Sequence, residues 1–380
     1  MTAKILNLSR LQLSIIIAAV SALLFIPFIG NLHLFDWDEI NFAECAREMI
    51  ETGNYMRVYI DYEPFWEKPP LFFWLQVISM KIFGINEFAA RFPNAVIGMI
   101  AMVALFNIGT TLKDKKFGLI WVLSYAGSIL PFFYFKSGII DPLFNLFMFL
   151  AVYFLYKTIS SGNRYYIFAG IATGLAVMVK GPVGYLLPSL TYGIIWLLKR
   201  KDNVLSIRGF LIYTLFTILT ASVWFGIELI MNGTWFINEF IRYQIRLLTT
   251  GDAGHSQPIY YHFLVVFFGC FPASIFIFKS MRIKWEEDQD SKMLRFFMLV
   301  LFGVVMVVFS LVKTKIVHYS SLAYYPLSFL AAYTVYSILS GKTELKKRNY
   351  IVYGIAALVP FILLILVPVL GIWKETFMPY

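Results

Sequence analysis

Long apolar segments dominate this chain and restrict it to the membrane. Windows long enough to cross a bilayer, about 17 to 25 residues each, recur along its whole length. Of its 380 residues, 59% are hydrophobic and only 14% are charged, whereas soluble domains carry about 25% charged residues. The windows lie near residues 11–30, 88–112, 117–136, 141–157, 164–181, 183–199, 208–231, 260–279, 294–312, 318–339 and 350–373. The sequence therefore predicts an all-α integral membrane protein with about eleven transmembrane helices.

Basic residues are distributed unequally between the two sides of this predicted membrane protein. With the N-terminus placed inside, inner segments hold 20 of the 32 Lys and Arg residues and 7 of the 22 acidic residues. The positive-inside rule then places residues 31–87, 232–259 and 374–380 outside the cytoplasmic (inner) membrane. The net charge of +10 does not indicate a nucleic acid partner, because the positive charges are not gathered on one soluble face.

No internal repeat or flexible linker divides the chain, so we predict a single membrane domain over residues 1–380. Two long outer loops, 31–87 and 232–259, carry most of its unusual polar residues. In the first loop, apolar residues at helical spacing predict an amphipathic juxtamembrane helix that stops at Gly53. A second, half-buried helix is expected over residues 70–83, with proline at its start, where the missing N–H has no consequence.

Two adjacent carboxylates, Asp38 and Glu39, open the first of these helices. Asp36 and Glu39 have the spacing of a capping box, and carboxylates favour a helix N-terminus. The same carboxylates at the mouth of a membrane protein are suited to general base catalysis. Their spacing alone leaves capping and catalysis equally open.

Three further charged residues stand at outer ends of predicted helices. Lys68 is followed by two prolines that fix its backbone, which favours an anion site over a simple interface anchor. Asp141 opens a membrane span, where a carboxylate needs either a partner or a capping role. Lys180 stands at a Gly-Pro break between two short spans. The glycine and proline explain the break, but they do not explain why a lysine stands there.

A last polar group, Lys313, Lys315, His318 and Tyr319, lies between two predicted spans. On a helix, Lys315, His318 and Tyr319 would share one face. Two lysines on the less basic side oppose the orientation rule. A local anion such as a phosphate would explain them.

Several motifs along the chain together resemble the GT-C glycosyltransferases related to lipid A aminoarabinose transferase and to protein O-mannosyltransferases. The resemblance covers nearly the whole chain and follows the family order. Its motifs are Asp38-Glu39, Phe42-Ala43-Glu44, Ala46-Arg47-Glu48-Met49, Gly53-Asn54-Tyr55, Glu67-Lys68-Pro69-Pro70-Leu71 with Trp74, Glu87 to Arg91-Phe92-Pro93, Ile140-Asp141-Pro142, Lys180-Gly181-Pro182, His255-Ser256-Gln257-Pro258 and Lys313-Thr314-Lys315 with His318-Tyr319.

By that resemblance, the donor is a sugar on a polyprenyl phosphate, moved with inversion to a lipid, glycan or protein acceptor. Asp38 and Asp141 match the family's essential aspartates. The expected lipid-phosphate contacts are Lys68, Lys315, Tyr319 and Arg246. No cofactor is required, although Glu67 and His255 resemble a possible divalent metal site. Family members often carry a soluble outer domain after the last helix, and none is predicted within this chain.

The main alternative function is a transporter or flippase for polyprenyl-linked sugars. Such a protein would also combine apolar lipid contacts with phosphate-binding charges. Transporters tend to show internal repeats and polar residues near the bilayer midplane. Neither feature is evident in this sequence, so it favours the glycosyltransferase.

Overall fold

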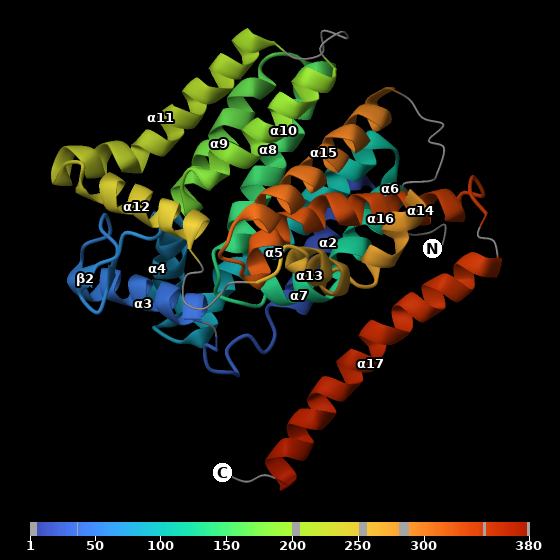
Figure 1. The fold of residues 1–380 in the computed structure, drawn as a ribbon, viewed down its shortest axis with the longest axis horizontal. Helices are drawn as coiled ribbons and strands as arrows, with labels where there is room; N and C mark the ends of the chain where they lie inside the picture. Colours follow the sequence, from blue (N-terminus) through green and yellow to red (C-terminus); the bar gives the residue numbers. More distant parts are fainter. Residues whose placement is uncertain are drawn as a thin grey trace.

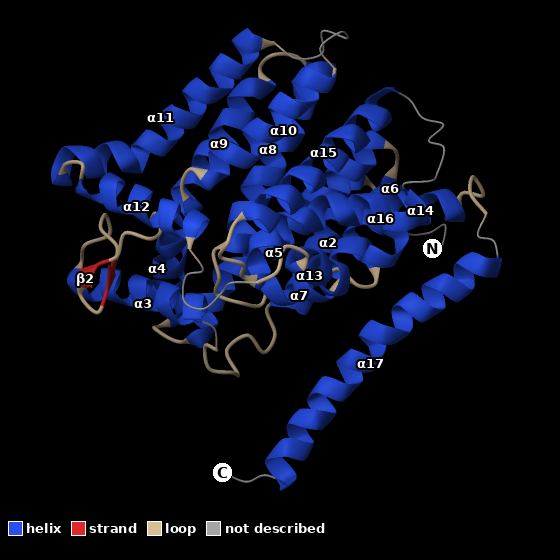
Figure 2. Cartoon of the chain, in the orientation of Figure 1, coloured by secondary structure: helices blue, strands red, loops and turns tan. Residues whose placement is uncertain are grey.

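The computed structural model describes residues 6–35, 37–199, 206–250, 257–280, 289–344 and 347–377. These residues form a helical bundle with one small β-hairpin on its flank, and α17 lies to one side (Figures 1 and 2). The elements are α2 (Arg10–Phe25), α3 (Trp37–Thr52), β1 (Tyr59–Ile60), β2 (Glu63–Pro64), α4 (Leu71–Phe83), α5 (Glu87–Leu112), α6 (Lys115–Ala126), α7 (Ile129–Tyr134), α8 (Asp141–Ser161), α9 (Tyr165–Lys180), α10 (Val183–Leu198), α11 (Ile207–Asn232), α12 (Trp235–Thr249), α13 (Tyr261–Gly269), η3 (Ala273–Phe276), α14 (Ile277–Ser280), α15 (Gln289–Leu311), η4 (Val317–Ala323), α16 (Tyr324–Leu339) and α17 (Lys347–Phe377).

Five helical segments of the described residues are long and apolar enough to cross a membrane. They are α5, α8, α11, α15 and the η4–α16 segment, Val317–Leu339. The shorter apolar helices α2, α4, α9 and α10 accompany them. The chain is therefore a multi-pass, all-α membrane protein, as predicted. The predicted number of about eleven spans is not confirmed.

Two predicted windows, 117–136 and 260–279, are interrupted and do not form continuous helices. The first becomes α6 and α7, and the second becomes α13, η3 and α14. The two interruptions lie against each other. The Ile129 N–H donates to the Phe271 carbonyl at 3.1 Å, and the Ser128 hydroxyl donates to the Cys270 carbonyl at 3.2 Å. Backbone that leaves a helix at membrane depth needs such partners within the protein.

Helix α9 packs against both α8 and α11. Its contact with α11 is close because α9 presents small residues to that helix. A Cβ at Gly170 would lie 2.5 Å from the Tyr213 carbonyl oxygen, and one at Gly174 would lie 2.5 Å from Thr220 Cβ. Small residues four positions apart allow two membrane helices to approach in this way. Helix α9 returns antiparallel to α8, which brings the end of α9 beside the start of α8.

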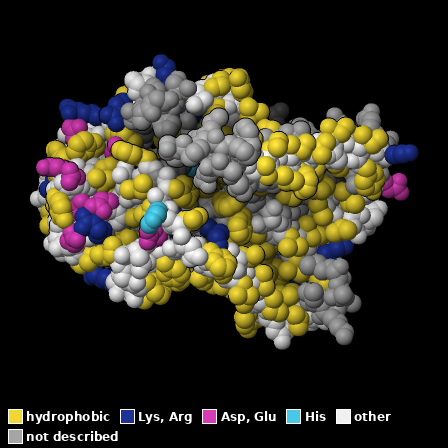
Figure 3. Space-filling model, turned by 90° about the horizontal axis from the view of Figure 1, so that it is seen from below, with side chains coloured by type: hydrophobic (Ala, Val, Ile, Leu, Met, Phe, Trp, Pro, Cys, Tyr) yellow, Lys and Arg dark blue, Asp and Glu magenta, His cyan; other side chains and the backbone are white. Residues whose placement is uncertain are grey.

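The two predicted outer helices are present. Helix α3 ends before Gly53, whose φ is +67°, and α4 begins directly after Pro70. The buried face of α3 packs against protein, chiefly α4, whereas Ile40 on the same helix is exposed. Its buried residues are Glu39, Phe42, Ala43, Cys45, Ala46, Glu48 and Met49. Charged side chains gather on the side of the molecule where α3 and the hairpin lie (Figure 3).

The two cysteines, Cys45 on α3 and Cys270 after α13, are buried and unpaired. Both behave as small apolar packing residues.

The predicted topology can be tested by labelling. Cysteines introduced singly at Asn54, before the hairpin, and at Asn163, between α8 and α9, should react with a membrane-impermeant reagent from opposite sides, because 20 of 32 basic residues fall on the inner side. The background carries Cys45→Ala and Cys270→Ala. Labelling of both sites from the same side would overturn the topology.

Candidate active site

Four ionisable side chains from different elements meet at the end of the bundle next to α3. His318 Nε2 lies 3.2 Å from Asp38 Oδ2 and 3.7 Å from Asp141 Oδ2. Lys180 Nζ donates to Asp141 Oδ1 at 2.7 Å. Asp141 and His318 are buried, while Asp38 and Lys180 are half-buried. The fold therefore gathers into one ionic cluster two aspartates and two basic residues that the sequence had singled out.

Asp141 does not act as a helix cap, the alternative that its position left open. Ile140 holds the N-cap position of α8 without a side-chain cap. The Asp141 carboxylate instead binds Lys180 through Oδ1, and within the described residues its Oδ2 accepts no hydrogen bond. Buried carboxylate oxygens normally have a donor. Asp141 therefore belongs to the ionic cluster with Lys180 and His318 and does not cap α8.

Electrostatics keep Asp38 anionic and Lys68 cationic. Burial opposes ionisation of Asp38, but the hydrogen bond and charge of His318 and the charges of Lys68 and Lys180 hold the pKa of Asp38 well below its usual value. Burial also opposes the charge of Lys68, but the carboxylates around it, Asp38 first among them, raise the pKa of Lys68 above its usual value. The site therefore offers fixed charges of both signs at neutral pH.

Two tyrosine rings hold the cations in place. Lys68 Nζ lies 5.1 Å from the centroid of the Tyr243 ring, and the Arg246 guanidinium lies 5.2 Å from the same centroid. Lys180 Nζ lies 4.8 Å from the Tyr319 centroid. A cation within about 6 Å of an aromatic face is attracted to it. Arg246, which is exposed, therefore shares with Lys68 the ring of Tyr243, a residue that was not among the predicted site residues.

An apolar groove begins at Lys68 and Lys180, and we call it the α10 groove. Its cavity of about 730 Å³ has Lys68, Asp141, Lys180 and Tyr319 at one end. From there it follows one face of α10, from Val183 to Leu197, over about 21 Å at 1.5 Å per residue. Residues of α12 and α15 form its other walls.

A second cavity, which we call the α2–α3 cavity, lies on the other side of the ionic cluster. It has a volume of about 710 Å³ and is lined mostly by apolar residues of α7 and of the segment between α2 and α3. Asp38, His318 and Lys315 line it as well. Asp38 and His318 thus stand between two apolar cavities that do not share a lining residue.

The segment before α16 differs from the expected helix. η4 begins only at Val317, and Ile316 is extended, with φ −117° and ψ 146°. Lys315 is therefore not on one helical face with His318 and Tyr319, and that prediction was wrong. Its Nζ donates to the Val312 carbonyl at 2.6 Å, and it lines the α2–α3 cavity instead of the α10 groove. Lys313 is exposed and lines neither cavity.

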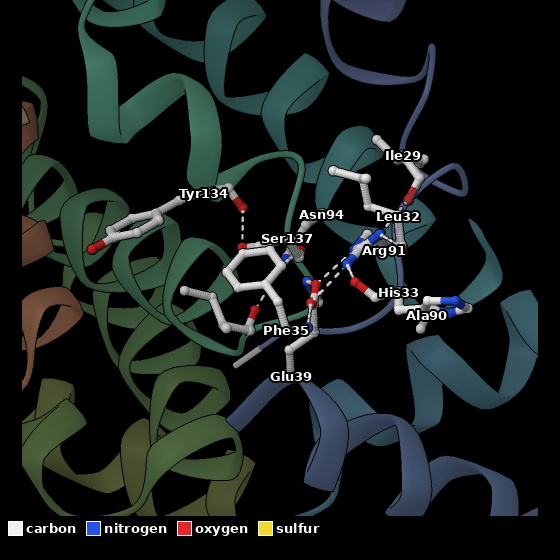
Figure 4. A network of polar contacts seen from close by, with 12 residues as sticks. Ile29, Leu32, His33, Phe35, Glu39, Ala90, Arg91, Asn94, Tyr134 and Ser137 are labelled. Atoms are coloured by element: carbon white, nitrogen blue, oxygen red, sulfur yellow. Dashed lines mark hydrogen bonds and ion pairs between the residues drawn. The ribbon is translucent and has the colours of Figure 1, made fainter. Parts of the chain in front are cut away.

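Glu39 is fully buried in a network with α5 and two loops (Figure 4). Its Oε1 accepts from Arg91 Nε at 2.7 Å and from the Gly138 N–H at 2.6 Å. Its Oε2 accepts from Arg91 Nη2 at 2.8 Å and from the Phe35 N–H at 3.2 Å. Because both oxygens are occupied, we correct the prediction that Glu39 is catalytic and assign it a structural role. Asp36, its expected capping partner, lies outside the described residues.

Arg91 and Asn94, two polar residues on one face of α5, were not among the predicted site residues. Arg91 is 3% exposed and Asn94 is 0% exposed, so both need partners inside the protein. The signal available in the sequence was an arginine and an asparagine one turn apart within an apolar window, a costly arrangement at membrane depth.

The predicted metal site is not tested by the structure. Glu67 Oε2 lies 3.7 Å from Lys68 Nζ, whereas His255 falls outside the described residues. Among the residues that are described, no three His, Cys, Asp or Glu side chains are grouped to hold a metal ion. Glu67 alone is an incomplete ligand set, so no step below passes through a metal.

Comparison with known proteins identifies the fold and the family. Residues 67–225 match the family model described as dolichyl-phosphate-mannose-protein mannosyltransferase. The solved structure of ArnT from Cupriavidus metallidurans, described as bound to undecaprenyl phosphate, superposes with a TM-score of 0.74 at 19% identity, covering 95% of this chain and 64% of that one. The protein thus has the GT-C fold of integral membrane transferases.

Two sequence relatives support the same assignment. The undecaprenyl phosphate-alpha-4-amino-4-deoxy-L-arabinose arabinosyl transferase of Wigglesworthia glossinidia brevipalpis is 26% identical over 372 residues, 95% of this chain and 65% of the relative. An uncharacterised protein of Aquifex aeolicus is 30% identical over 326 residues, 83% of this chain and 72% of the relative. The chain belongs to the GT-C-fold family of polyprenyl-phosphate-sugar glycosyltransferases. It spans slightly less than two thirds of the length of the arabinosyl transferase.

Proposed function

We propose that this protein moves a sugar from a polyprenyl-phosphate donor to an acceptor at the outer face of the cytoplasmic membrane. The observation that carries this proposal is the α10 groove, which is apolar along α10 and ends at Lys68 and Lys180. A prenyl chain suits the apolar length, and its phosphate suits the two ammonium groups. A transporter is less well supported, because the described charges gather at one end of the groove.

The arrangement of charges supports a direct, inverting displacement. An acceptor oxygen attacks the anomeric carbon while the bond from that carbon to the phosphate oxygen breaks. Both electrons of the broken bond pass to the phosphate, and polyprenyl phosphate leaves. Lys68 and Lys180 stabilise the growing negative charge, and Asp38 stands toward the α2–α3 cavity to orient or deprotonate the acceptor. Attack from the side opposite the leaving group inverts the anomeric centre.

The lining of the α2–α3 cavity supports a lipid as the acceptor. It is mostly apolar, and three of its aromatic residues, Phe28, Phe35 and Trp37, are exposed. Lys315 and Lys136 add positive charge to the same lining. An amphipathic acceptor with an anionic headgroup matches this combination. If the accepting group is itself a phosphate, no base is needed and Asp38 acts only by orienting it.

The donor class can be tested directly. Purified protein incubated with a polyprenyl-phosphate sugar and a membrane lipid extract should form a new glycolipid, detected by mass spectrometry, without any added nucleotide. The physical reason is the placement of clustered lysines at the end of an apolar groove. Turnover of a soluble nucleotide sugar, with none of the lipid-linked donor, would refute the proposal.

The sugar class is a finer proposal. Because several relatives are named arabinosyl transferases, we expect a pentosyl donor to be used in preference to a hexosyl donor on the same polyprenyl phosphate. Parallel reactions with undecaprenyl-phosphate-linked 4-amino-4-deoxy-L-arabinose and undecaprenyl-phosphate mannose measure the preference. Faster transfer of mannose would reverse it.

A further inference from the structure

Two polar residues of α5, Arg91 and Asn94, hold the two loops that lead into the active-site aspartates. Every N–H of the Arg91 guanidinium is used. Two donate to Glu39, and the others donate to the carbonyls of the segment before α3, to Ile29 at 2.6 Å, Leu32 at 2.7 Å and His33 at 2.9 Å. The segment between α2 and α3 is therefore fixed to α5 a few residues before Asp38.

Asn94, one turn further along α5, holds the second loop. Its Nδ2 donates to the Ser137 carbonyl at 2.7 Å and to the Ile139 carbonyl at 2.6 Å. The intervening Gly138 N–H donates to Glu39 Oε1. Three consecutive residues, Ser137 to Ile139, are thus bound through their backbones just before Asp141, the first residue of α8 (Figure 4).

Glu39 joins the two halves of this network. It directly follows Asp38 in the chain, and it reaches across to the loop that ends in Asp141. A buried Arg–Glu pair gives little net stability compared with apolar packing, because desolvation of both charges offsets their attraction. Arg91 is 3% exposed and Glu39 is 0% exposed, so this pair is fully buried. The presence of the pair is better explained by the fixed geometry that a two-point, planar contact imposes.

We propose that Arg91, Asn94, Glu39 and Gly138 are positioning residues that set the separation between Asp38 and Asp141 for the transfer step. This inference rests on the function proposed above. The network touches neither the α10 groove nor its lysines. Disturbing it should therefore affect the chemical step while leaving donor binding in place.

Gly138 offers a mild way to disturb the network. An alanine Cβ there would lie 3.1 Å from Glu39 Cγ, 3.3 Å from the Ala90 carbonyl oxygen of α5 and 3.4 Å from Glu39 Oε1, so Glu39 and α5 must move apart by a few tenths of an ångström. Gly138 lies outside the left-handed region, so alanine adds no backbone strain there. Misplacement of catalytic groups by about 1 Å can cost about 100-fold in rate.

The test compares Gly138→Ala with wild type and with Gly303→Ala, a control on α15 whose Cβ would meet nothing within 4 Å. We expect the single-turnover rate of Gly138→Ala to fall by about tenfold or more. Its affinity for undecaprenyl phosphate and its thermal unfolding should stay at the control value. Asn94→Ala, which removes both carbonyl contacts, should give a larger fall with the same unchanged affinity.

The outcomes separate the two proposals. An inactive wild type that still binds undecaprenyl phosphate would contradict the proposed function, not the packing of the network. An active wild type with equal rates in all three variants would overturn the positioning role. Loss of undecaprenyl phosphate binding together with rate would also overturn it, since that result shows a general structural role. A selective loss of rate supports it.

Discussion

Asp38→Asn should slow the chemical step by about 10² to 10⁴-fold and leave donor binding nearly unchanged. Asparagine keeps the size of the side chain and some of its hydrogen bonding, but it removes the negative charge that faces His318, 3.2 Å away. Asp38 also lines the α2–α3 cavity and does not line the α10 groove, which is why donor affinity should survive. Single-turnover kinetics and binding of undecaprenyl phosphate measure the two effects separately.

The control for this variant is Asp61→Asn, an exposed carboxylate in the same outer loop that lines neither cavity. It should behave as wild type. If Asp38 only helped to start α3, Asp38→Asn would be silent too, because asparagine serves helix N-termini about as well as aspartate. Normal turnover by Asp38→Asn would therefore remove Asp38 from the active site.

Lys68→Ala should weaken donor binding and slow transfer together. A charge-assisted contact to phosphate is worth roughly 1.5 to 3 kcal/mol, which corresponds to about a ten- to 150-fold change. The charge on the phosphate grows as the bond breaks, so the rate should fall beyond the loss of affinity. The buried ammonium, whose pKa is raised chiefly by the nearby carboxylates against the effect of burial, is charged at all pH values used for assay.

Lys81→Ala provides the matched control. Lys81 also lies over a tyrosine ring, 4.3 Å from the Tyr55 centroid, but it is exposed on α4 and lines neither cavity. Binding of undecaprenyl phosphate by both variants, followed by their transfer rates, distinguishes a specific phosphate contact from a general loss of a basic residue. Unchanged binding and rate in Lys68→Ala would return Lys68 to the role of an interface anchor.

Much of the candidate site could be predicted from local sequence context. Lys68 was singled out because two prolines follow it, Asp141 because it begins an apolar window, and Lys180 because a helix break does not explain it. All three line the same end of the α10 groove. A charged residue in an apolar segment carries a large desolvation penalty, so its presence alone indicates a partner or a ligand.

The positions of Lys315 and Glu39 could not be predicted in the same way. Lys315 was expected at the donor phosphate from the family resemblance, but it precedes an extended Ile316 and lines the α2–α3 cavity instead. Glu39 was paired with Asp38 as a catalytic group, but Arg91 and Gly138 occupy its oxygens. Both errors arise because a side chain's role depends on neighbours distant in sequence.

The sequence by itself determined that this protein lies in a membrane, that its long outer loops carry helices, and that its charges lie near one end of the bundle. Hydropathy, proline and glycine positions act locally, so they can be read residue by residue. The tertiary structure alone decided that Asp38 and Asp141 share His318, and that this cluster stands between two separate cavities. Those relations join segments about 100 and 180 residues apart, and only the packing of helices such as α5, α8 and η4 brings these side chains close together.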